Sequence, residues 1–249
     1  MAKAEERKEA RMIPLRDANP SYATPVVNLA IMTACTLMFL YELSLGARLT
    51  HFIAQYGLVP VRWARLEAAG RLSFPQGWAP FLSSLFLHAG WMHLIGNMWV
   101  LHIFGDNVES YLGHARYALF YLACGVAAGL AQVLAGHASH LPVVGASGAI
   151  AGVMGAYLVL FPGARILTLI PLFFIFPLLE IPAFVFLILW FLLQFLSGAN
   201  SLLQRGDAGG VAWWAHAGGF VCGILLLPLF KIGRGAGRGI ARGRGRWGA

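Results

Sequence analysis

The chain has 249 residues, of which 59% are hydrophobic and only 11% are charged, and its mean hydropathy is +0.70. A water-soluble domain carries about 25% charged residues, so this composition excludes that class and predicts a membrane protein. The formal net charge of +8 would suit nucleic acid, but Lys and Arg lie at the chain ends and in loops. Anionic lipid headgroups are the nearer partner there, and we expect no nucleic-acid partner.

The N-terminal segment, residues 1–20, is polar and alternates basic with acidic side chains. It has no apolar stretch of the kind that a cleavable signal sequence needs. We therefore expect a solvated cytoplasmic tail.

Six apolar blocks follow this segment, separated by Gly, Pro or charged residues. They cover about 25–45, 81–104, 116–135, 143–161, 182–197 and 211–230. Blocks of about 20 residues have the length that a helix needs to cross about 30 Å of hydrocarbon. The sequence thus predicts an all-α polytopic membrane protein, with six transmembrane helices in one domain over residues 21–230.

One further apolar stretch, Ile166–Leu179, does not fit this pattern. Pro171 and Pro177 interrupt it, and it is too short to cross the bilayer unless it joins the next helix. We expect an interfacial or re-entrant segment there.

The distribution of basic residues predicts the orientation of the chain. If both termini are cytoplasmic, most of the 18 Lys and Arg residues lie on the inner side, as in other membrane proteins. Residues 231–249 form a basic Arg/Gly tail, which is also typical of RNA-binding segments. A basic tail directly after a membrane span is more often an orientation signal, and we interpret it so.

Four polar side chains lie inside the apolar blocks, where an unpaired polar group costs several kcal/mol and therefore marks a candidate functional site. Ser147 and His216 are near the starts of the fourth and sixth blocks, and His93 and Asn97 are one helical turn apart in the second. Under the predicted orientation, the chain enters both of these blocks from the outer side of the membrane. Ser147 and His216 should thus lie at the same depth, four to five residues in.

Small residues at intervals of four predict close approach of the fourth and sixth helices, which would let the two side chains meet. The glycines that we assign to this close packing are Gly145, Gly148, Gly152, Gly219 and Gly223.

These residue types indicate nucleophilic catalysis. A serine hydroxyl becomes an effective nucleophile when an imidazole accepts its proton. No carboxylate lies at the same depth, so we predict a Ser147/His216 dyad and not a triad. His93, Asn97 and the Ser147 backbone N–H would then stabilise the negative oxygen of the intermediate. Alone, Ser147 would more often be a packing residue, and His216 a pore, relay or metal residue. Their combination favours catalysis.

The same residues resemble the motifs of the rhomboid intramembrane serine proteases. The nucleophile motif Gly-x-Ser-Gly is present at 145–148, the histidine motif at 215–219, and the His-x-x-x-Asn element at 93–97. His88 and Glu109 match a further loop histidine and a glutamate of that family. The resemblance covers about residues 20–230.

The resemblance implies a six-helix fold and a dyad that uses neither metal nor cofactor and opens toward the extracytoplasmic side. It also implies cleavage of single-span membrane proteins in or beside their transmembrane segment. Two departures concern the surroundings of the site: Trp78 is followed by Ala79 and Pro80 where many members have Trp-Arg, and Ala151 stands where some have an aromatic residue on the histidine.

We expect a bacterial cytoplasmic membrane as the location of the chain, and the lipid bilayer and single-span proteins as its partners. The sequence does not predict an oligomeric state. The chief alternative is a catalytically inactive rhomboid-like binder or chaperone of membrane proteins. A small transporter with a polar cluster at a broken helix is a more distant one.

Overall fold

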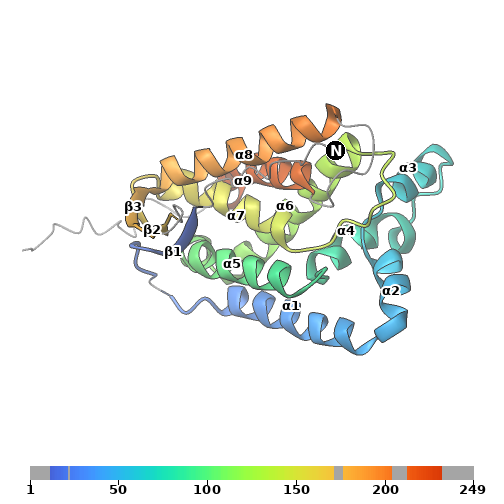
Figure 1. The fold of residues 1–249 in the computed structure, drawn as a ribbon, viewed down its shortest axis with the longest axis horizontal. Coiled ribbons are helices and arrows are strands. Elements are labelled where there is room, and N and C mark those ends of the chain that lie inside the picture. Colours follow the sequence, from blue (N-terminus) through green and yellow to red (C-terminus); the bar gives the residue numbers. More distant parts are fainter. Residues whose placement is uncertain (1–11, 22, 171–175, 204–211, 232–249) are drawn as a thin grey trace, which may run out of the picture.

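The computed structural model describes residues 12–21, 23–170, 176–203 and 212–231 (Figure 1). Most of the predicted basic tail at 231–249 and the first half of the predicted tail at 1–20 lie outside these ranges. The longer helices are α1 (Val26–Ser44), α2 (Leu49–Tyr56), α3 (Pro60–Ala68), α5 (Trp91–Leu112), α6 (His114–Ala135), α7 (Ser147–Leu160), α8 (Ala183–Leu203) and α9 (Trp213–Lys231).

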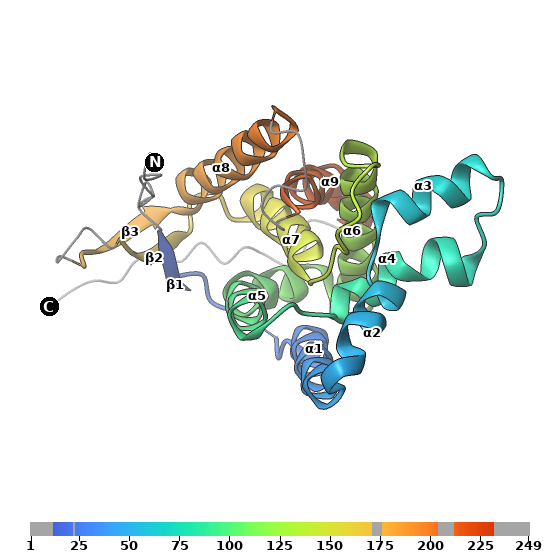
Figure 2. The same cartoon turned by 45° about the vertical axis from the view of Figure 1, so that its right-hand side comes forward.

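The remaining elements are short. Four short helical segments are η1 (Gly46–Arg48), η2 (Phe74–Trp78), α4 (Ala79–Ser83) and η3 (Ser84–Phe86), and three strands are β1 (Ile13–Asp17), β2 (Arg165–Leu169) and β3 (Leu178–Pro182). The strands gather at one end of the helical bundle, and α2, α3 and α4 lie at the other (Figures 1 and 2).

The mostly helical architecture confirms the predicted class of a polytopic helical membrane protein. Four of the described helices, α1, α6, α8 and α9, are long and apolar enough to cross a membrane. The predicted count of six stays a prediction for α5 and α7. Helix α5 carries several polar side chains, and α7 has 14 residues. At the helical rise α7 is about 21 Å long, which is less than the hydrocarbon thickness.

The three strands form an antiparallel sheet that the sequence analysis did not predict, in the order β1-β2-β3. Ile13 pairs with Leu169, and Ile166 pairs with Ile181. Along β2 the buried residues alternate, as in a strand with one covered face. Residues 13–17 therefore form a strand within the predicted N-terminal tail. The stretch Ile166–Leu179 likewise contributes strands at both of its ends.

Asp17, the last residue of β1, connects this sheet to the helices. Its carboxylate accepts hydrogen bonds from Tyr157 Oη on α7, at 2.5 Å, and from Asn107 Nδ2 on α5, at 3.0 Å. Burial raises the pKa of the Asp17 carboxyl above its ordinary value. The sheet is thus fixed to the C-terminal ends of α5 and α7.

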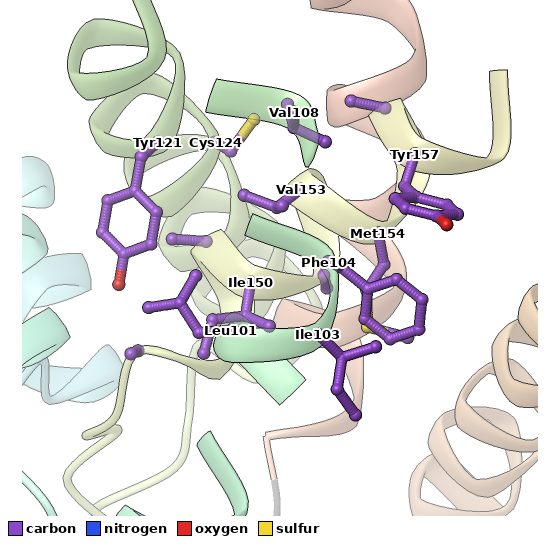
Figure 3. Close-up of a cluster of buried hydrophobic side chains, with 14 of the residues drawn as sticks. Leu101, Ile103, Phe104, Val108, Tyr121, Cys124, Ile150, Val153, Met154 and Tyr157 are labelled. Atoms are coloured by element: carbon purple, nitrogen blue, oxygen red, sulfur yellow. The ribbon is translucent and has the colours of Figure 1, made fainter. Parts of the chain in front are cut away.

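The core of the bundle lies where α5, α6 and α7 meet (Figure 3). Leu101 and Phe104 of α5 and Tyr121 of α6 are fully buried, and so is Val153 of α7. Every residue of α7 from Gly148 to Tyr157 is buried. Because α7 is enclosed along most of its length, its N-terminus has a fixed position against α5 and α6.

Helices α7 and α9 approach each other through glycine. A methyl group on Gly219 would overlap the backbone carbonyl of Gly148, and one on Gly223 would overlap that of Gly152. A methyl group on Gly152 would lie 2.5 Å from Cys124 Cβ on α6. Only glycine permits this distance between the two backbones.

We expect Gly219→Ala to lower the melting temperature of the purified protein in detergent, because the added methyl group must push α9 away from α7. Forced packing of this kind costs about 1–3 kcal/mol. Gly96→Ala on α5 is the matched control, since a methyl group there meets no atom within 4 Å. Equal melting temperatures for the two variants would contradict the close approach.

Candidate active site

Ser147 is the first residue of α7 and follows a tight turn at Gly145. The φ of Gly145 is +117°, a conformation that L-residues rarely adopt, and its N–H donates to the Ser84 carbonyl at 2.9 Å. The predicted start of this helix was near Val143, but Val143 instead bridges to Leu58 in the loop ahead of α3. Ser147 therefore stands at the helix N-terminus, where backbone N–H groups have no intrahelical acceptor.

His216 is the fourth residue of α9 and faces Ser147. Its Nε2 lies 2.8 Å from Ser147 Oγ, so the structure brings these two predicted residues together. The Ala215 N–H, one residue earlier, donates to Gln132 Oε1 on α6 at 3.1 Å. An imidazole nitrogen at this distance can accept the hydroxyl proton of the serine during attack on a carbonyl carbon.

The far side of the imidazole contacts groups that were not predicted from the sequence. His216 Nδ1 lies 2.7 Å from Oε1 of Gln194 on α8. The ring centroid is 6.1 Å from that of Trp190 and 6.3 Å from that of Trp213. Ala151, where an aromatic partner was missing, is fully buried. Two tryptophans thus flank the imidazole from α8 and α9.

His93 and Asn97 both face the turn ahead of Ser147. A methyl group built on Gly145 would lie 2.5 Å from His93 Nε2 and 3.4 Å from Asn97 Nδ2. The Ala89 N–H donates to His93 Nδ1 at 3.5 Å, which favours the tautomer with the proton on Nε2. Asn97 Nδ2 is buried and has no hydrogen-bond partner among the described residues. Two side-chain nitrogens therefore lie beside Gly145, two residues ahead of Ser147.

His88 holds the loop that leads into α5. Its backbone N–H donates to the buried carboxylate of Glu42 on α1 at 3.2 Å, and its ring stacks edge-on with His93 at 5.2 Å. His88 thus packs against His93 while its backbone is anchored to α1.

The loop between α3 and α5 is fixed by aromatic side chains where the Trp-Arg pair was missing. Trp78 packs edge-on against Trp63 at 6.1 Å and tilted against Phe81 at 5.5 Å. Phe81 and Trp63 are buried. Apolar packing joins η2 to α3 and α4 at this point.

Glu109, the second residue noted in the resemblance, lies at the opposite end of α5 from His93. Its buried carboxylate accepts the N–H groups of Val27 and Asn28, at 2.9 and 2.7 Å. It therefore caps the N-terminus of α1 and supports the fold without contacting Ser147.

Gln194 could have been found from the sequence, because it is an amide inside a block of apolar residues. The rule that selected Ser147 and His216 applies to it equally. Trp190 and Trp213 carried no such signal, since tryptophan is common at membrane interfaces. Within the described ranges, no group of three or more His, Cys, Asp or Glu side chains could hold a metal ion.

The sequence of this chain also matches a known protein family. The model of the Rhomboid domain matches residues 75–231. The Rhomboid protease GluP of Bacillus subtilis is 30% identical over 156 residues, which are 63% of this chain and 28% of that protein. Rhomboid protein 1, mitochondrial, of Saccharomyces cerevisiae is 32% identical over 153 residues, 58% of this chain and 39% of that protein. Rhomboid-like protein 11, chloroplastic, of Arabidopsis thaliana is 41% identical over 80 residues, 32% and 28% of the two chains. The chain thus spans less than half the length of these relatives.

Proposed function

Because this chain belongs to the rhomboid family of multi-pass membrane proteins, we propose that it is an intramembrane serine endopeptidase with Ser147 as nucleophile and His216 as general base. The observation that carries the proposal is the 2.8 Å separation of Ser147 Oγ and His216 Nε2. Similarity to proteins named rhomboid protease supports the same reaction class.

In the proposed reaction, Ser147 Oγ attacks the carbonyl carbon of a substrate peptide bond while its proton moves to His216 Nε2. The resulting imidazolium returns that proton to the leaving amine as the C–N bond breaks, which gives an acyl-enzyme. A water molecule, deprotonated by the same nitrogen, then releases the second fragment and regenerates the Ser147 hydroxyl.

The tetrahedral intermediates carry a negative oxygen that needs donors in place before the reaction begins. We propose His93 Nε2–H, Asn97 Nδ2–H and the Ser147 backbone N–H for this role. The unpaired state of Asn97 Nδ2 supports it, because a buried donor without a partner is costly unless a ligand uses it. The positive end of the α7 dipole adds to the stabilisation.

We further propose that the substrates are single-span membrane proteins, cut in or beside the transmembrane segment. The substrate helix would unwind between α5 and α8 to expose a carbonyl, and Gly or Pro in the substrate would favour that step. On the basic-residue distribution, both termini face the cytoplasm and the site opens to the extracytoplasmic face of a bacterial cytoplasmic membrane.

A reconstituted assay tests the proposal. Purified protein in liposomes is incubated with tagged single-span proteins, and the products are separated on a gel. The wild type should release a fragment and should be labelled by a fluorophosphonate probe, whereas Ser147→Ala should do neither. An unlabelled wild type that nevertheless co-purifies with the substrates would support the inactive binder instead. Equal cutting by the variant would sink the mechanism.

A further inference from the structure

Helix α8 carries one amide in an otherwise apolar stretch. From Ala183 to Leu196 its side chains are aliphatic or aromatic apart from Gln194. An amide in hydrocarbon is unfavourable unless it is hydrogen-bonded, so its partner identifies its role. The partner is the imidazole of His216, and Gln194 is partly buried on the side of α8 toward α9.

The contact joins three residues from three helices into one chain of hydrogen bonds. Gln194 Oε1 lies 2.7 Å from His216 Nδ1, and His216 Nε2 lies 2.8 Å from Ser147 Oγ. Helix α8 lies beside α9 in both views of the fold (Figures 1 and 2). Near the end of α8, four residues beyond Gln194, Gly198 lets the helix lie close to Trp213 and Trp214 of α9.

Resting on the proposed function, we propose that Gln194 is a positioning residue that completes a Ser147–His216–Gln194 triad. An amide oxygen only accepts hydrogen bonds, so His216 Nδ1 must carry the proton of the neutral ring. Nε2 then has a free lone pair toward Ser147 Oγ, which is the tautomer that a general base requires. The same oxygen also stabilises the imidazolium that forms after proton transfer.

This role differs from that of the two tryptophans beside the ring. Trp190 and Trp213 limit where the imidazole can lie, but their contacts do not choose between the two ring nitrogens. Gln194 is the described side chain that hydrogen-bonds Nδ1, so it sets both the ring orientation and the tautomer. An amide serves as third member in the Cys-His-Asn proteases, which shows that a carboxylate is not required.

Gln194→Leu removes the acceptor at nearly constant volume. We expect kcat for a single-span substrate in liposomes to fall roughly tenfold to a hundredfold with KM unchanged, because the base loses its tautomer preference and not its substrate contacts. Gln194→Glu keeps an acceptor at the same position and should recover most of kcat. The rate of fluorophosphonate labelling should follow the same order.

Two controls separate this role from a structural one. Leu193→Ala alters the adjacent, exposed position on α8 and should leave kcat at the wild-type level. Gln132→Leu removes the other amide near the site, which contacts the Ala215 backbone and not the ring. Because Gln132 does not contact the imidazole, Gln132→Leu should not show a fall in kcat that Gln132→Glu restores. Melting temperatures of all variants are measured in parallel.

The outcomes distinguish the triad from the proposed function. If the wild type cuts, Ser147→Ala does not, and Gln194→Leu keeps the wild-type kcat, the triad is overturned and the dyad stands. The triad is also overturned if Gln194→Glu does not recover kcat and both Gln194 variants have equally lowered melting temperatures. If the wild type fails to cut any substrate and takes no probe, it is the proposed function that fails.

Discussion

Removal of either the Ser147 hydroxyl or the His216 imidazole is expected to lower kcat by roughly a factor of a million, and removal of both should lower it no further. Residues that act as one catalytic unit show this non-additivity, because the second loss removes nothing that still operates. The 2.8 Å hydrogen bond between the two side chains is the reason to expect such a unit here. The measurement is single-turnover cleavage by Ser147→Ala, His216→Ala and the double variant.

Ser44→Ala is the matched control for this series. Ser44 lies at the exposed end of α1, where its hydroxyl donates to the Tyr41 carbonyl, and the change should leave cleavage intact. If kcat of the double variant fell by the product of the two single reductions, a shared proton transfer would be contradicted. Residual cleavage in all three should reflect the oxyanion donors and substrate binding alone.

Asn97→Ala is expected to lower kcat by about 100-fold to 1,000-fold while the protein stays as stable as the wild type. Loss of one oxyanion donor has an effect of that size in well-studied serine proteases. The stability should not fall, because Asn97 Nδ2 makes no hydrogen bond among the described residues and its removal leaves no such partner unsatisfied. The two measurements are kcat in liposomes and the melting temperature.

Asn28 provides a contrasting buried amide. Its Nδ2 donates to the Leu101 carbonyl at 3.1 Å and its Oδ1 accepts from Tyr117 Oη at 2.7 Å. Asn28→Ala should therefore destabilise the protein by about 1–3 kcal/mol, since it leaves buried partners unsatisfied. The folded fraction should retain its kcat. A large loss of stability in Asn97→Ala would show that Asn97 supports the fold instead of the reaction.

The membrane class and the positions of most long helices follow from the sequence. Continuous apolar blocks can be buried only in lipid or in a large core, and their lengths set where helices run. Helix ends were less predictable. Ser147 begins α7 because Gly145 turns the chain there and its N–H bonds to Ser84, which lies far away in sequence. The apolar block begins ahead of that turn, so hydrophobicity alone does not indicate where the helix starts.

The sheet was missed for a related reason. β1 and β2 are separated by more than half of the chain, and neither strand has the apolar length or alternation to indicate a partner. In the sequence, Asp17 is one of several charges in a polar segment. Only the fold shows that Tyr157 and Asn107 donate hydrogen bonds to it. Pairing between distant segments is a property of the folded chain and not of either segment alone.

By itself, the sequence determined the membrane class and the candidate site residues Ser147, His216, His93 and Asn97, because polar side chains and glycines are conspicuous in apolar blocks. Only the tertiary structure decided which atoms meet. It brought Ser147 Oγ to His216 Nε2, and it set Gln194 of α8 against Nδ1. The physical reason is that hydrogen bonds between helices depend on how closely and at what height the helices pack, which no single segment encodes.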